Sequence, residues 1–98
     1  MTRGLFVRAE AKSELREAFA WYQTRRVGLG FEFLRTVRVT LAAIERTPEL
    51  YPFALDDIRK ASLPRFPYVV YYVALPAGTS VFAVIHERRH PKRWQSRR

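Results

Sequence analysis

The sequence contains no cysteine, which excludes a disulfide framework, a thiol nucleophile and a cysteine-ligated zinc or iron–sulfur site. It also has no apolar run near the roughly 18 residues that a membrane span needs, and early charges rule out a signal sequence. These absences predict a soluble, cytoplasmic protein with no membrane contact. At 98 residues the chain is too short for a multidomain enzyme, so we expect a single domain over residues 1–98.

Acidic residues are scarce: 9 Asp and Glu stand against 18 Lys and Arg, for a formal net charge of +9. Residues 88–98 hold six of the cations and no acid, which leaves 12 − 9 = +3 for residues 1–87. Hydrophobic residues at 48% and aromatics at 14% exclude a disordered basic protein. The sequence therefore predicts a folded domain that carries a basic C-terminal tail, either simply solvated or facing an anionic partner.

Two amphipathic helices are predicted in the first half of the chain. Apolar residues recur at steps of three and four from Ala9 to about Gln23, and again from about Phe31 to Arg46. On the first helix, the charged residues are assigned to the solvent side, Glu14 among them. Only a short glycine-containing connection separates the two patterns, so we expect an antiparallel helical hairpin.

The second half of the chain is rich in β-branched and aromatic residues, which favour strands. Strands are predicted for Leu5–Val7, for Ile58–Leu63 next to a turn or at an edge, and for a hairpin of Tyr68–Leu75 with Thr79–Ile85. The resulting β-α-α-β-β-β order predicts an α+β fold, with the helical hairpin packed on a small, mainly antiparallel sheet. Because Tyr68–Leu75 is apolar on both faces, its second face is either covered or used for binding.

One short motif resembles a zinc site but does not have the required context. Residues 86–90 read His-Glu-Arg-Arg-His, which matches the H-E-x-x-H pattern of zinc metalloproteases. That pattern needs a helix, whereas here strand formers precede His86 and Pro91 directly follows His90. In a strand the two histidines would be about 13 Å apart. We therefore predict no metal site and no cofactor.

The segment after the last predicted strand combines guanidinium, imidazole and indole groups that suit binding of phosphates and bases. Its candidate target-binding residues are Arg88, Arg89, Lys92, Arg93 and Trp94. Trp94 is either a platform for a base or an anchor that packs the tail onto the sheet. For metal-independent RNA cleavage, the candidates are Arg89 for phosphate binding and His86 or His90 for proton transfer.

The chain resembles the RelE/ParE superfamily of bacterial type II toxins over nearly its whole length. The resemblance rests on the order of the elements, on "TPELYP", and most specifically on residues 65–72 (RFPYVVYY) and 86–94 (HERRHPKRW). It implies a small toxin that a cognate antitoxin neutralises by wrapping over the toxin surface. Tyr68, Val70 and Tyr72 are then the expected antitoxin contacts, because they explain the second apolar face of their strand.

The departures from the family pattern favour one branch. RelE-like members cut messenger RNA on the ribosome and carry an Arg where this sequence has Tyr68, and their C-terminal Tyr has no counterpart here. The resemblance therefore favours the ParE-like branch, whose members poison DNA gyrase and are not nucleases. The alternatives are a RelE-like, metal-independent endoribonuclease and a small basic nucleic-acid-binding domain without toxicity.

Overall fold

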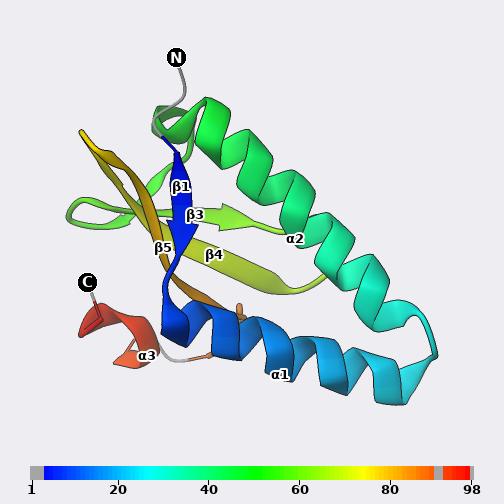
Figure 1. Ribbon diagram of the computed structural model, residues 1–98. Coiled ribbons are helices and arrows are strands. Elements are labelled where there is room, and N and C mark those ends of the chain that lie inside the picture. Colours follow the sequence, from blue (N-terminus) through cyan, green and yellow to red (C-terminus); the bar gives the residue numbers. More distant parts are fainter. Residues whose placement is uncertain (1–3, 90–91, 98) are drawn as a thin grey trace.

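The computed structural model describes residues 4–89 and 92–97, excluding the side chains of Lys92 and Arg93. Figure 1 shows a helical hairpin lying against a sheet. The elements are β1 (Leu5–Val7), α1 (Ala9–Arg25), α2 (Leu29–Arg46), the 3-10 turn η1 (Pro48–Leu50), β2 (Phe53–Leu55), β3 (Ile58–Ser62), β4 (Tyr68–Leu75), β5 (Gly78–His86) and α3 (Lys92–Gln95). The predicted α+β class and helical hairpin are confirmed, and β2 and α3 are additions that the sequence did not predict.

The five strands form one sheet in the order β1-β5-β4-β3-β2. Strand β1 runs parallel to β5, with Leu5 opposite Thr79, and the other neighbours are antiparallel. The mainly antiparallel sheet is therefore confirmed. Strand β3 lies beside the turn at 64–67, as predicted, but it is not an edge strand, because the short strand β2 forms the edge on that side of the sheet. Three residues after Pro52 are too few to show a strand period, which is why β2 escaped prediction.

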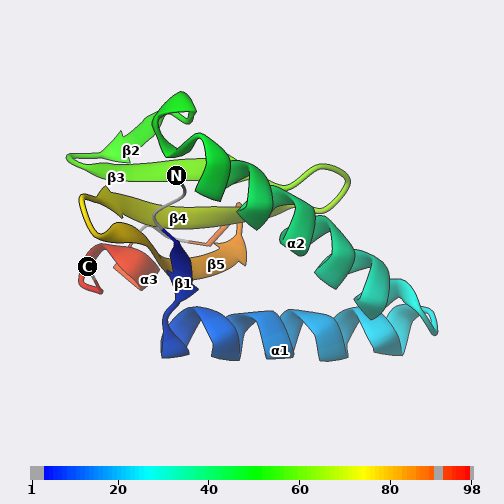
Figure 2. The same ribbon diagram turned by 45° about the horizontal axis from the view of Figure 1, so that its top comes forward.

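The two helices cover one face of the sheet, and this arrangement is visible in both Figure 1 and Figure 2. Their buried side chains form one core cluster with residues from β3, β4 and β5, including Phe33, Val37 and Val70. Within residues 4–89 and 92–97, no helix is both long enough and apolar enough to serve as a membrane span.

The second face of the sheet carries its own core cluster, made of Ile58, Val73, Phe82, Ala83, Ile85 and Trp94. A register shift opposite Tyr71 and Tyr72 places an extra residue in β5, because Tyr71 pairs with Ala83 and Tyr72 with Val81. As a result Phe82 and Ala83 both belong to this second cluster. Trp94 of α3 packs into it, so the second apolar face is covered by the chain's own C-terminal segment.

Candidate functional site at the end of strand β5

The end of β5 turns sharply and exposes two arginines. The Glu87 N–H donates to the Pro67 carbonyl at 2.9 Å, and the Arg89 N–H donates to the His86 carbonyl at 2.9 Å. These bonds hold the turn against the start of β4, and they leave the side chains of Arg88 and Arg89 exposed. The predicted cationic group at the strand end is therefore present for these two residues.

His86 ends a strand, as the argument against the zinc motif required. Its Nδ1 accepts a hydrogen bond from the Arg88 N–H at 3.1 Å, so a neutral His86 carries its proton on Nε2. Its ring lies 5.5 Å from that of Tyr68, the residue opposite it in the β4–β5 register. His90, the second candidate histidine, lies outside the described residues.

A cleft of about 590 Å³ opens between α1 and the ends of β4 and β5. Two carboxylates and aromatic rings line the α1 side, and His86 and Arg89 line the strand side; the full lining is Glu14, Glu17, Ala18, Trp21, Tyr22, Pro67, Tyr68, Val84, Ile85, His86 and Arg89. The cleft thus combines an aromatic floor with charges of both signs. Such a lining suits a peptide or a nucleotide.

The phenols in this cleft are held in their protonated form. Burial raises the pKa of Tyr68, the Arg89 charge partly offsets that rise, and Glu17 adds to it. Burial also raises the pKa of Tyr22. Both hydroxyls therefore remain hydrogen-bond donors at neutral pH, and neither serves as a base.

Glu14 closes the open edge of β5 beside the cleft. Strand β1 pairs with β5 only as far as Val81, so beyond this residue the edge has no strand partner among the residues that the structure describes. There Glu14 Oε1 accepts a hydrogen bond from the Val84 N–H at 3.0 Å, and Oε2 lies 2.9 Å from Arg97 Nη1. The side chain of Glu14 is only 11% exposed, so its assignment to the solvent side of α1 was wrong.

The residues predicted to bind the target differ in their exposure and in how much of them the structure describes. Lys92 and Arg93 lie in α3, but their side chains are outside the description. Trp94 is 4% exposed and stacks on Tyr71, with ring centroids 4.3 Å apart and planes at 20°. The anchor interpretation of Trp94 therefore holds in this structure, and the ring offers no open face to a base.

The three predicted antitoxin contacts also differ in their surroundings. Val70 and Tyr72 are fully buried beneath the helices, so neither presents surface to another chain. The prediction misplaced them because period two shows which residues share a face and not which face the helices cover. Tyr68 is only half-buried and lines the cleft, so it remains accessible.

The sequence did not predict the α1 wall of the cleft, which includes Glu14, Glu17 and Trp21. A signal for Glu14 was present, because it lies three residues after Ala11 and four before Ala18 on the buried stripe of α1. An acid on an apolar stripe indicates a specific partner. Glu17 and Trp21 carried no such signal.

The helical hairpin and the five-stranded sheet define an α+β protein of the RelE/ParE-like fold. A chain of the chromosomal ParDE TA system from P. aeruginosa has this fold, with a TM-score of 0.77 at 10% sequence identity. The match covers 85% of this chain and 94% of that chain. Neither a comparison with protein-family models nor one with curated proteins finds a match for the sequence.

Proposed function

We propose that this protein is the toxin component of a type II toxin–antitoxin system, that it inhibits growth by poisoning DNA gyrase, and that a cognate antitoxin neutralises it. The observation that carries the proposal is the fold shared with a chain of the ParDE TA system, over 94% of that chain. Tyr68, which stands where the resembling nucleases carry an Arg, supports the gyrase-directed branch.

In this proposal the turn after β5 contacts the target. Arg88 and Arg89 are exposed, and within the described residues neither side chain has a hydrogen bond or ion pair. Their guanidinium groups are thus available to a gyrase–DNA complex, with Lys92 and Arg93 close by in sequence. In this proposal the turn binds the target and takes part in no chemical step.

The antitoxin, in turn, occupies the cleft between α1 and β5. Trp21 is 50% exposed and Tyr68 is accessible, so a peptide there would cover aromatic surface that now meets solvent. Bound in this position, it would also lie over Arg89 and block the target-binding turn. Binding and neutralisation would then share one surface.

A gyrase assay tests the target. We expect the purified protein to trap gyrase–DNA cleavage complexes on supercoiled plasmid, and Arg88→Ala/Arg89→Ala to weaken trapping by about tenfold or more. Lys12→Ala/Arg16→Ala on α1 is the matched control, because it removes the same two charges at exposed positions whose side chains have no partner among the described residues. Normal growth on expression without a partner, together with no trapping, would refute the proposal.

Metal-independent RNA cleavage is the second candidate. The cleft favours it because His86, Arg89 and Tyr68 line one wall, where they could contact a phosphate and the oxygens around it. The RNA 2′-oxygen would attack phosphorus and displace the 5′-oxygen, with His86 moving the proton and Arg89 holding the phosphate. Cleavage of message in a cell-free translation mix, insensitive to chelator and lost in Arg89→Ala, would establish this activity in place of gyrase poisoning.

A further inference from the structure

The solvent-facing side of α2 carries three arginines that neither proposed activity uses. Arg35, Arg38 and Arg46 are all exposed, and at 3.6 residues per turn they lie within an arc of about 80°. The buried residues Phe33 and Ile44 lie on the opposite side of the helix, against the sheet. Figures 1 and 2 show α2 along one face of the sheet. Because the side of α2 opposite the arginines is buried, the arginine side faces solvent.

These three arginines, like those at positions 16, 88 and 89, have no partner in the described part of the chain, whereas the other arginines with described side chains do. Within residues 4–89 and 92–97, none of the three has a hydrogen bond, ion pair or ring contact. By contrast Arg26 and Arg65 share Glu32, and Arg59 and Arg97 hold carbonyls or a carboxylate. Arginines with internal partners shape the fold, whereas unpaired ones on a common face are available to an external anion.

The charge on this face of α2 is nearly all of one sign. The helix has two acids: Glu32 is committed to Arg26 and Arg65, and Glu45 lies at the flank of the arginine face. The outer side of α1 is different, because Lys12 and Arg16 alternate there with Glu10 and Glu17. In contrast to α1, the arginine stripe of α2, about 17 Å long at 1.5 Å per residue, has an acid only at its flank.

We propose that this α2 stripe, Arg35, Arg38 and Arg46, binds the phosphate backbone of duplex DNA. A duplex presents one phosphate charge about every 1.7 Å of its axis, so a stripe about 17 Å long lies beside roughly ten phosphate charges, and the two charge patterns are complementary. Between the arginines lie Val39 and Ala42, which are small enough for close approach and offer no ring on which a single-stranded base stacks. Such a contact depends on the charge and shape of the DNA backbone and not on the base sequence.

This inference goes beyond the proposed function and does not depend on it, because it involves neither the β5 turn nor the cleft. It predicts that the protein alone binds a short labelled DNA duplex of arbitrary sequence, with an affinity that falls as salt rises. Substituting Arg35→Gln, Arg38→Gln and Arg46→Gln together should reduce the slope of log K against log salt by about 2.7. Affinity at low salt should fall by about tenfold or more.

The control is a triple variant that loses the same charge elsewhere: Lys12→Gln, Arg16→Gln and Lys60→Gln, all at exposed positions. Fluorescence anisotropy across a salt series measures both triple variants, and circular dichroism confirms that each is folded. The variant Arg35→Lys, Arg38→Lys and Arg46→Lys should retain most of the binding, since it keeps the charge.

The proposal would be overturned if the unaltered protein did not bind the duplex, or if both glutamine triple variants lost affinity equally. Tighter binding of single-stranded DNA than of duplex DNA would also overturn it. So would anionic vesicles that bind the protein more tightly than the duplex does and respond to the same substitutions. Trapping of gyrase by the α2 glutamine triple, with duplex binding lost, would support the α2 surface as a site separate from the gyrase-binding turn.

Discussion

At the scale of single residues, Tyr72 shows how a polar group is retained inside the core. Its side chain is fully buried between the sheet and the helices, and its hydroxyl donates to the Pro48 carbonyl at 2.6 Å. Burial raises the pKa of Tyr72 to about 12, an effect that Arg59 opposes and that Tyr51 and Glu49 reinforce. The hydrogen bond satisfies the hydroxyl without exposing it.

The raised pKa makes protein stability fall in alkaline solution. Because the unfolded phenol ionises near pH 10 and the folded one near 12, the contribution of Tyr72 is complete below about pH 10 and is lost as pH rises towards 12. We expect Tyr72→Phe to lower the free energy of unfolding by about 1 kcal/mol at neutral pH. It should also flatten the decline above pH 10.

Urea denaturation at a series of pH values between neutrality and pH 11 measures both effects. An unchanged alkaline decline in Tyr72→Phe would show that other groups cause it. Tyr22, Tyr68 and Tyr71 also have pKa values raised by burial, so part of the decline should persist in the variant.

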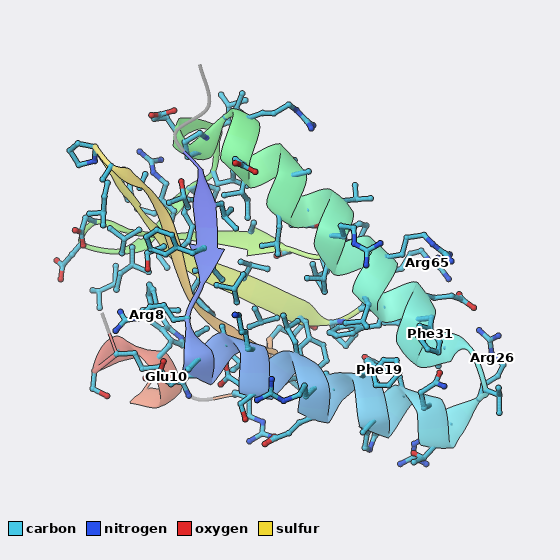
Figure 3. The ribbon with its side chains drawn as sticks, in the orientation of Figure 1. Arg8, Glu10, Phe19, Arg26, Phe31 and Arg65 are labelled. Atoms are coloured by element: carbon cyan, nitrogen blue, oxygen red, sulfur yellow. The ribbon has the colours of Figure 1, made fainter. Side chains whose placement is uncertain are left out.

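At the scale of elements, the α1–α2 hairpin depends on the glutamine Gln23 and on the glycine Gly30. Gln23 Oε1 accepts hydrogen bonds from the N–H groups of Gly28 at 2.9 Å and Gly30 at 2.8 Å, so it caps the start of α2. This cap explains why α2 begins at Leu29, two residues before the predicted start. Beside it Phe19 and Phe31 pack edge to face, with ring centroids 5.0 Å apart. Figure 3 shows these two residues next to each other between α1 and α2.

Gly30→Ala should destabilise the protein although alanine is the better helix former. A Cβ at position 30 would lie 2.7 Å from the Phe19 carbonyl oxygen and 2.7 Å from Gln23 Cγ. Because the first of these is backbone, the helices must move apart, and we expect a loss of about 1–3 kcal/mol in urea denaturation. Ser13→Ala, at an exposed position of α1, is the control and should change stability by less than about 0.5 kcal/mol. Equal stability of Gly30→Ala and the unaltered protein would refute the close approach.

Glu14 acts between elements, since it joins α1 to the edge of β5 and to the C-terminal segment. We expect Glu14→Ala to cost about 2–3 kcal/mol, because it leaves the Val84 N–H and the Arg97 guanidinium without their partner. Glu14→Gln should cost roughly half as much, since an amide oxygen still accepts from Val84. Urea denaturation measures both, with Glu17→Gln as the control on the same helix.

A double-mutant cycle with Arg97→Ala isolates the ion pair. If Glu14→Gln and Arg97→Ala prove additive, the carboxylate does not hold the C-terminal segment in solution. A favourable coupling energy would show that α3 is positioned from α1, and hence that the basic segment next to the β5 turn has a defined place.

At the scale of the whole molecule, the sheet is covered on both faces, and the second cover is small. Helices α1 and α2 cover one face, whereas on the other face Trp94 from the short helix α3 packs against Phe82 and Tyr71. The segment that looks like a solvated basic tail in the sequence is therefore partly core. Removing it would expose an apolar face as well as remove charge.

Trp94→Ala should accordingly destabilise the protein by about 3–5 kcal/mol. If that variant does not fold, Trp94→Phe should still fold, with a smaller loss. Trp21→Ala is the matched control, because Trp21 is 50% exposed and should lose about 1 kcal/mol or less. Thermal unfolding and binding of a dye specific for apolar surface report the effect, and similar losses for the two alanine variants would contradict the buried role of Trp94.

The sequence by itself determined the elements that depend on local pattern. Periods of three to four and of two predicted α1, α2, β4 and β5 to within a few residues, and strand formers before His86 excluded the helical zinc motif. The cationic turn at Arg88 and Arg89 was equally visible, because charges in a short segment need no tertiary information.

Tertiary structure alone decided which faces were buried. The parallel pairing of β1 with β5, the extra residue in β5, the inward position of Glu14 and the docking of Trp94 all join residues that are distant in sequence. Local periodicity carries no information about such pairings. For that reason Val70 and Tyr72 were predicted as partner contacts and proved to lie in the core, while Glu14 was predicted at the surface and its side chain proved to be only 11% exposed.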